Sequence, residues 1–143
     1  QQHHKHSFHL IQHADFLGMT PDEQTMVAHV ARYHRGSAPD RGKHVTFGRL
    51  ARATRERIQR LSAILRVADG FDRGHSAAVI QLKVRWMERA LRITAHPDPR
   101  TKSMRLELWG ANRKKALLEE MAGTPVEIVA PDGSVVNDED EES

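Results

Sequence analysis

Residues 65–90 read LRVADGFDRGHSAAVIQLKVRWMERA, and the spacing of the apolar residues changes within this stretch. Up to Phe71 the apolar residues recur every three or four positions, which is typical of an amphipathic helix. Beyond Gly74 they alternate with polar residues, which is typical of a strand with one apolar face; the apolar members are Ile80, Leu82, Val84 and Trp86. The change of period therefore predicts a boundary between a helical part and a part that contains a sheet.

Three helices are predicted before this boundary. The first covers residues 3–14, and the second begins at a capping box made by Thr20, Pro21 and Glu23 and continues to about residue 34. A loop is expected over 36–48, and the third helix over 52–71. One row of the third helix is expected to face a core and to continue through two carboxylates; its members are Ile58, Leu61, Leu65, Ala68, Asp69 and Asp72.

The part after the boundary is predicted to have the order β-β-β-α-β. The strands are expected at 80–86, 91–95, 104–108 and 126–129 and the helix at 112–121, most simply with an antiparallel sheet. The fold class expected is therefore α+β. Its domains would be a helical bundle at 1–75 that is incomplete at its N-terminus, a small α+β domain at 76–136 and a disordered acidic tail at 137–143.

Composition excludes several classes of function. The chain has no cysteine, which rules out disulfides, cysteine nucleophiles and thiolate zinc sites and fits a cytoplasmic protein. No apolar run approaches the roughly 20 residues of a membrane span. The net charge is +3, but five acidic residues lie at 138–142, so the rest of the chain is more basic. That basic part is expected to attract polyanions.

Histidines are concentrated near the start of the chain, where seven of the ten lie within residues 1–34. His34 continues an apolar row of the second helix, and Asp69 continues the row of the third. Imidazole and carboxylate groups that converge in a core would suit a divalent metal ion. The alternative is a core histidine bonded to a backbone carbonyl, with Asp69 paired to Arg66 or Arg73.

Three ordered strings resemble a known family. HHKHSFHLI at 3–11, VARYHR at 30–35 and LRVADGFDRGHS at 65–76 look like the third domain of the exopolyphosphatase and guanosine pentaphosphate phosphohydrolase family, and RLELWGANRKKALLEE at 105–120 is similar to its final segment. The resemblance implies a domain of the HD type. It also implies vestigial metal-ligand positions, with Mg²⁺ or Mn²⁺ in the full-length protein, at His4, His6, His34 and Asp69.

The sequence departs from the HD pattern because it contains no adjacent His-Asp pair. The helix that would hold this pair is expected to lie before Gln1, so the chain reads as a segment that is not catalytic alone and contains no cofactor of its own. In the family, cleavage is attributed to N-terminal actin-like domains with phosphate-binding loops, which this sequence lacks. The resemblance thus implies a helper role, such as holding a polyphosphate chain or supporting a homodimer.

Basic residues of the predicted sheet suggest where a polyanion would bind. They alternate with the apolar residues and are expected on the opposite face of the sheet; the candidates for binding inorganic polyphosphate are Lys83, Arg85, Arg92 and Arg105. The alternative is an ordinary solvated face. Two rival functions are a self-contained HD-type metal phosphohydrolase and a basic nucleic-acid-binding module, although the face has few aromatic residues for stacking on bases.

Overall fold

The computed structural model describes residues 3–141 and divides into two compact units, Gln1–Leu65 and Arg66–Ser143. We call them the helical unit and the α+β unit. The division falls within the long helix α4 (Arg52–Phe71), before the boundary predicted after residue 75. The reason is that Val67 and Phe71, near the end of α4, belong to the core of the α+β unit.

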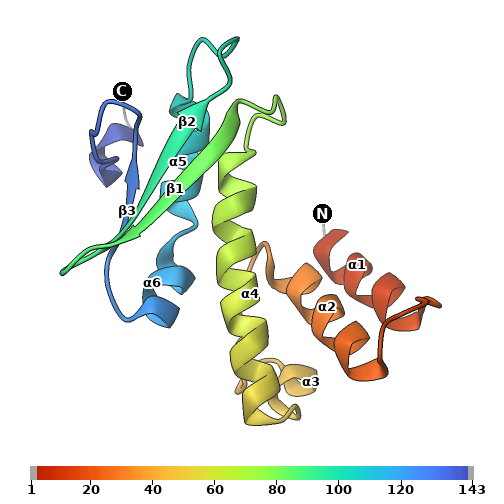
Figure 1. Cartoon of the computed structure of the whole chain (residues 1–143). Helices are drawn as coiled ribbons and strands as arrows, with labels where there is room; N and C mark the ends of the chain where they lie inside the picture. Colours follow the sequence, from red (N-terminus) through yellow and green to blue (C-terminus); the bar gives the residue numbers. More distant parts are fainter. Residues whose placement is uncertain (1–2, 142–143) are drawn as a thin grey trace. The chain divides into compact units, whose positions relative to one another are not determined.

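The helical unit contains α1 (His3–His13), α2 (Pro21–Tyr33), α3 (Val45–Gly48) and the first part of α4 (Figure 1). The three predicted helices are present, and α3 is a short helix within the predicted loop. Helix α2 begins at the predicted capping box. Glu23 N–H donates to Thr20 Oγ1 at 3.1 Å, and Thr20 N–H donates to Glu23 Oε2 at 2.8 Å.

The core of the helical unit is formed by Tyr33, Phe47 and Ile58. The residues of α2 that are buried are Ala28, His29 and Tyr33. The row of α2 predicted to face inward, formed by Val27, Val30, Ala31 and His34, is only partly covered. Val30 packs against this core, whereas Val27 is 42% exposed and His34 is partly buried. The buried histidine of this helix is His29, which the sequence did not single out.

Helix α4 turns a different row toward the cores than the one predicted. Its buried residues are Ile58, Ser62, Ala63, Arg66, Val67, Gly70 and Phe71. The predicted row is largely exposed after Ile58, with Leu61 46% exposed and Asp72 on the surface, while Asp69 is partly buried. The helix has apolar residues along two rows, and periodicity alone does not say which of them is covered.

The α+β unit has a three-stranded sheet in the order β1-β2-β3. Strand β1 (Val79–Trp86) pairs antiparallel with β2 (Leu91–Pro97), and β2 pairs parallel with β3 (Val126–Val129). Between β2 and β3 the chain passes through α5 (Arg105–Arg113) and α6 (Ala116–Ala122), because a parallel pair requires a long crossover connection (Figure 1).

The predicted third strand at 104–108 was wrong, because these residues lead into and begin helix α5. The order is β-β-α-α-β and the sheet is mixed rather than antiparallel. Alternation over five residues is also compatible with a helix, in which Met104, Leu108 and Ala111 lie on one side. Met104 and Ala111 are buried in the core of the unit, and Leu108 packs against it.

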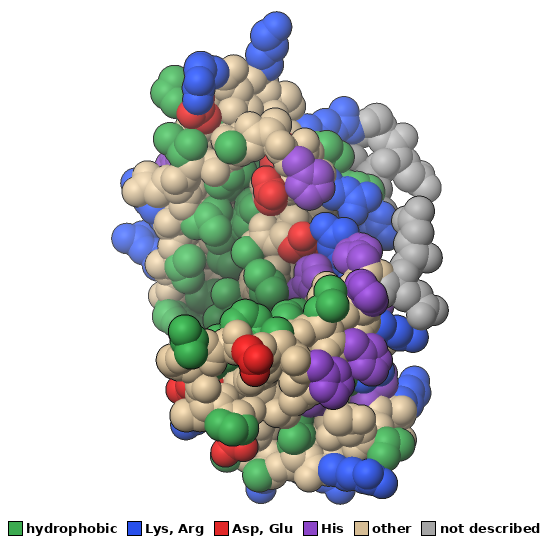
Figure 2. All heavy atoms as spheres, turned by 90° about the vertical axis from the view of Figure 1, so that its right-hand side faces the viewer, with side chains coloured by type: hydrophobic (Ala, Val, Ile, Leu, Met, Phe, Trp, Pro, Cys, Tyr) green, Lys and Arg blue, Asp and Glu red, His purple; other side chains and the backbone are tan. Residues whose placement is uncertain are grey.

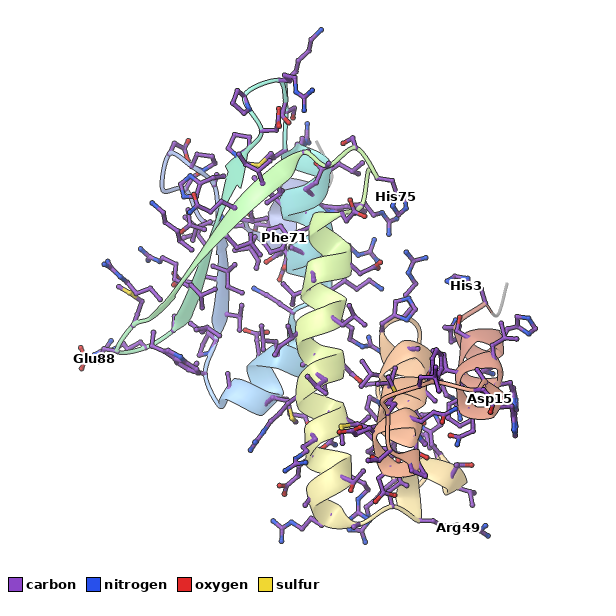
Figure 3. All side chains as sticks on the ribbon, turned by 45° about the vertical axis from the view of Figure 1, so that its right-hand side comes forward. His3, Asp15, Arg49, Phe71, His75 and Glu88 are labelled. Atoms are coloured by element: carbon purple, nitrogen blue, oxygen red, sulfur yellow. The ribbon has the colours of Figure 1, made fainter. Side chains whose placement is uncertain are left out.

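One face of the sheet carries this core. Its buried members include Leu91, Ile93, Ala95, Val126 and Ile128 from β2 and β3, together with Phe71, which Figure 3 labels. The predicted inward residues of β1 lie on the same face of the sheet, as the pairing of Val84 with Ile93 shows. However, β1 is an edge strand, and these residues are exposed. The helices of the core cluster therefore cover β2 and β3 more completely than β1.

The predicted acidic tail begins with a short helical turn. Residues Asp138–Glu141 form a short 3-10 helix, and Asn112 Nδ2 donates to Asp138 Oδ1 at 3.0 Å. The last two residues of that tail, 142–143, lie outside the described part of the chain. Among residues 3–141, none of the helices combines the length and the apolar character that crossing a membrane demands.

Candidate anion-binding site

Basic side chains gather on the face of the sheet opposite the core. Because side chains alternate along a strand, the buried Leu91 and Ile93 direct Arg92 and Thr94 to the other face. The antiparallel register places Lys83 opposite Thr94 and Arg85 opposite Arg92. Three of the four predicted polyphosphate-binding residues, Lys83, Arg85 and Arg92, are therefore brought together by β1 and β2.

These three residues line one pocket of about 480 Å³. We call it the basic pocket, and its other lining residues are Val84, Thr94, Val129, Ala130, Pro131 and Gly133. None of the described residues that line it is acidic. Its volume falls within the range of about 300–1,000 Å³ that is common for ligand pockets. The basic pocket is thus large enough for a small ligand and is lined by three positively charged side chains.

Lys83 and Arg85 are exposed, and within residues 3–141 the side chain of neither forms a hydrogen bond or an ion pair. Arg85 lies directly opposite Arg92, and like charges in this position destabilise a sheet by roughly 0.2–1 kcal/mol. An anion bound between them would remove this repulsion. Arg92 is also bonded to Glu127 of the neighbouring strand, which offsets part of this repulsion, so Lys83 and Arg85 are the cations most available to a phosphate group.

A turn after β3 forms one wall of the basic pocket. Gly133 N–H donates to the carbonyl of Ala130 at 2.9 Å and closes this turn. Asp132 is the acidic residue of the turn, and its carboxylate accepts bonds from Ser134 N at 2.9 Å and Ser134 Oγ at 2.6 Å. These bonds, the one from the Ser134 hydroxyl first, lower the pKa of Asp132.

Arg105, the fourth predicted residue, is not part of the basic pocket. It begins helix α5 and lines two other pockets together with Ser103 and Trp109. Because 104–108 is not a strand, the alternation that seemed to align Arg105 with Lys83 and Arg85 has no structural counterpart. The proposed anion site therefore keeps three of the four residues.

The histidines form a second cluster, in the helical unit. The ring of His3 lies 5.7 Å from that of His4 and 6.3 Å from that of His34, measured between centroids. His34 Nδ1–H donates to the carbonyl of Ala31, which is the local alternative considered for it. Figure 2 shows histidine side chains gathered on the surface of the molecule, and Figure 3 labels His3 at the start of α1.

This cluster does not show the arrangement of a metal centre. Among the residues that the structure describes, no three His, Asp or Glu side chains are placed to hold a metal ion. His6 is exposed, and Asp69 belongs to the α+β unit. The ligand set of His4, His6, His34 and Asp69 therefore stays a prediction.

The pKa values of three histidines make the helical unit sensitive to acid. Burial lowers the pKa of His29, whose Nδ1–H donates to the carbonyl of Thr25 at 2.8 Å, and burial also lowers the pKa of His4 and of His44. Each folded-state pKa lies below the ordinary value of 6.5. Their contribution to stability is therefore complete above about pH 6.5 and is lost as the pH falls below it.

We expect the helical unit to melt at a lower temperature at pH 5 than at pH 7.5. The NMR signals of Tyr33, the single tyrosine of the chain, follow this unit during heating. His29→Gln, which cannot be protonated, should reduce the difference between the two pH values, whereas the exposed His13→Gln should not. An equal pH dependence in all three proteins would contradict this assignment.

Two features of the basic pocket could not be read from the sequence. Glu127 of β3 lies beside Arg92, because the parallel register pairs these two residues. The alternation of Val126, Glu127 and Ile128 indicates that Glu127 faces away from the core, but not which strand is its neighbour. The sequence also did not predict that residues 130–133 form a wall of the pocket. A turn that follows a strand does not indicate which face of the sheet it covers.

Comparison with known proteins gives one family. The model described as Ppx/GppA phosphatase, domain III, matches residues 1–115. The match includes the helical unit, β1, β2 and α5, and it ends before α6 and β3. No curated protein matches the chain.

Proposed function

Because this chain belongs to the Ppx/GppA phosphatase family, with its domain III over residues 1–115, we propose that it is a module that binds phosphate polyanions. Its ligand would be inorganic polyphosphate or the phosphate chain of guanosine pentaphosphate. Other domains of the protein, of the actin-like kind, would carry out the hydrolysis. The module itself would hold the chain of phosphates without cleaving it, in the cytoplasm.

The basic pocket is the observation that supports this proposal. Lys83 and Arg85 have no bonded partner within the described residues, and Arg85 faces Arg92 across the hairpin. The guanidinium group of an arginine matches the geometry of a phosphate group and can bind it through two parallel N–H···O hydrogen bonds. A linear polyanion can contact several such groups at once, which compensates for the weakness of each single exposed contact.

Calorimetric titration of the chain with long-chain polyphosphate tests the proposal. We expect saturable binding that weakens as salt is raised, because exposed charges are screened. We also expect no release of orthophosphate, and no displacement of polyphosphate by duplex DNA at equal phosphate concentration. Absence of binding at low salt would refute the proposal, and stronger binding to DNA would favour a nucleic-acid-binding module.

A further inference from the structure

Glu127 is the acidic residue closest in register to the basic pocket, and it is bonded to one of the pocket's three cations. Arg92 Nε donates to Glu127 Oε2 at 3.0 Å, and Arg92 Nη2 lies 2.9 Å from the same oxygen. The Arg92 side chain is 40% exposed and that of Glu127 is 31% exposed. The pair is thus partly accessible to solvent and lies at the edge of the pocket rather than in the core.

The registers of the three strands place Arg85, Arg92 and Glu127 in one row across the sheet. Arg92 is the middle member, with a positive neighbour on one side and a negative neighbour on the other. It bonds to the negative neighbour, and two of its donor groups are used there. These donors are not free for a phosphate, and the carboxylate itself repels any anion that approaches Arg92.

The next row across the sheet lacks a corresponding acid. It consists of Lys83, Thr94 and Val129, all of which line the basic pocket. The cations without a partner among the described residues, Lys83 and Arg85, therefore both lie on β1. The acidic residue of these rows, Glu127, lies on β3. An anion in the basic pocket therefore meets unpaired cations on β1 and a carboxylate on β3.

We propose that Glu127 is an internal competitor that lowers the affinity of the basic pocket for phosphate anions by holding Arg92. This inference rests on the proposed function, since it concerns the same pocket. Arg92 is the least available of the three cations of the basic pocket, because its Nε and Nη2 atoms already contact Glu127 Oε2.

Calorimetric titration with polyphosphate at low salt tests this role in four proteins: the unaltered chain, Glu127→Gln, Glu127→Thr and Glu120→Gln. Both changes at Glu127 remove the charge, and threonine is well suited to a strand. Glu120 is exposed on α6, so its replacement changes the net charge equally without touching Arg92. We expect the Glu127 variants to bind about three- to fivefold more tightly, the effect of removing one exposed charge, and Glu120→Gln to bind as before.

The outcomes separate this inference from the proposed function. If the unaltered chain binds but the Glu127 variants bind equally or more weakly, Glu127 is not a competitor and the proposed function stands. If only the Glu127 variants bind, the competitor role stands and the native function is not polyphosphate binding. If none of the proteins binds, both ideas fail. Tryptophan fluorescence of Trp86 and Trp109, both in the α+β unit, confirms that each variant is folded.

Discussion

Replacement of Gly70 by alanine is expected to destabilise the α+β unit by about 3 kcal/mol or more. Helices α4 and α5 cross here at Gly70 and Gly110, and a Cβ atom on Gly70 would lie 2.5 Å from the carbonyl oxygen of Gly110 and 2.7 Å from Ala111 Cα. These are backbone atoms that cannot move aside without shifting a helix. Alanine favours a helix over glycine by about 1 kcal/mol, which is too little to offset the clash.

Gly74→Ala is the matched comparison for this prediction. Its Cβ would lie 2.8 Å from Glu107 Oε1, which is the end of a side chain and not a backbone atom. We expect a loss below about 1 kcal/mol for this change. Urea unfolding followed by tryptophan fluorescence measures both variants, because Trp86 and Trp109 lie in the α+β unit. Equal stability of the two variants would show that the helices do not cross at Gly70.

Reversal of two charges in the basic pocket is expected to have the largest effect on binding. Lys83→Glu combined with Arg85→Glu replaces the two cations that have no partner among the described residues by two anions. We expect the affinity for polyphosphate to fall by at least about tenfold, since attraction becomes repulsion at the point of contact. Both side chains are exposed, so the stability of the sheet should change little.

Lys102→Glu combined with Arg105→Glu is the control, because it changes the net charge by the same amount outside the basic pocket. Arg105 lines other pockets on α5, and Lys102 lies in the segment before that helix. We expect the affinity to change by less than about twofold, a difference consistent with screened distant charges. A similar loss in both double variants would mean that the overall charge, and not the pocket, attracts the polyanion.

Much of the helical architecture was predictable because its signals are local. The capping box at Thr20 and Glu23 defines the start of α2 within a few residues, and both of its hydrogen bonds are present. The segment 52–71 was also correct as a helix. Which side of α4 is buried was not predictable, because that depends on elements distant in the sequence. Leu61 and Val67 are equally apolar, yet only Val67 is buried.

The candidate anion site was predictable only in part. Lys83, Arg85 and Arg92 alternate with apolar residues on two strands joined by a hairpin, so local pattern was sufficient to align them. Arg105 was misplaced because a five-residue alternation does not distinguish a short strand from the first turns of a helix. Glu127 was missed because its pairing with Arg92 depends on a parallel register between strands far apart in the chain.

The central claim is that phosphate anions bind at the basic pocket, and the most direct test is to map the amide resonances that shift when polyphosphate is added to the labelled chain. We expect the largest shifts at Lys83, Arg85, Arg92 and Thr94 and in the turn at 130–133, the residues that line or close this pocket. Shifts confined to the histidine cluster of α1 and α2, or spread evenly over all basic residues, would contradict the claim.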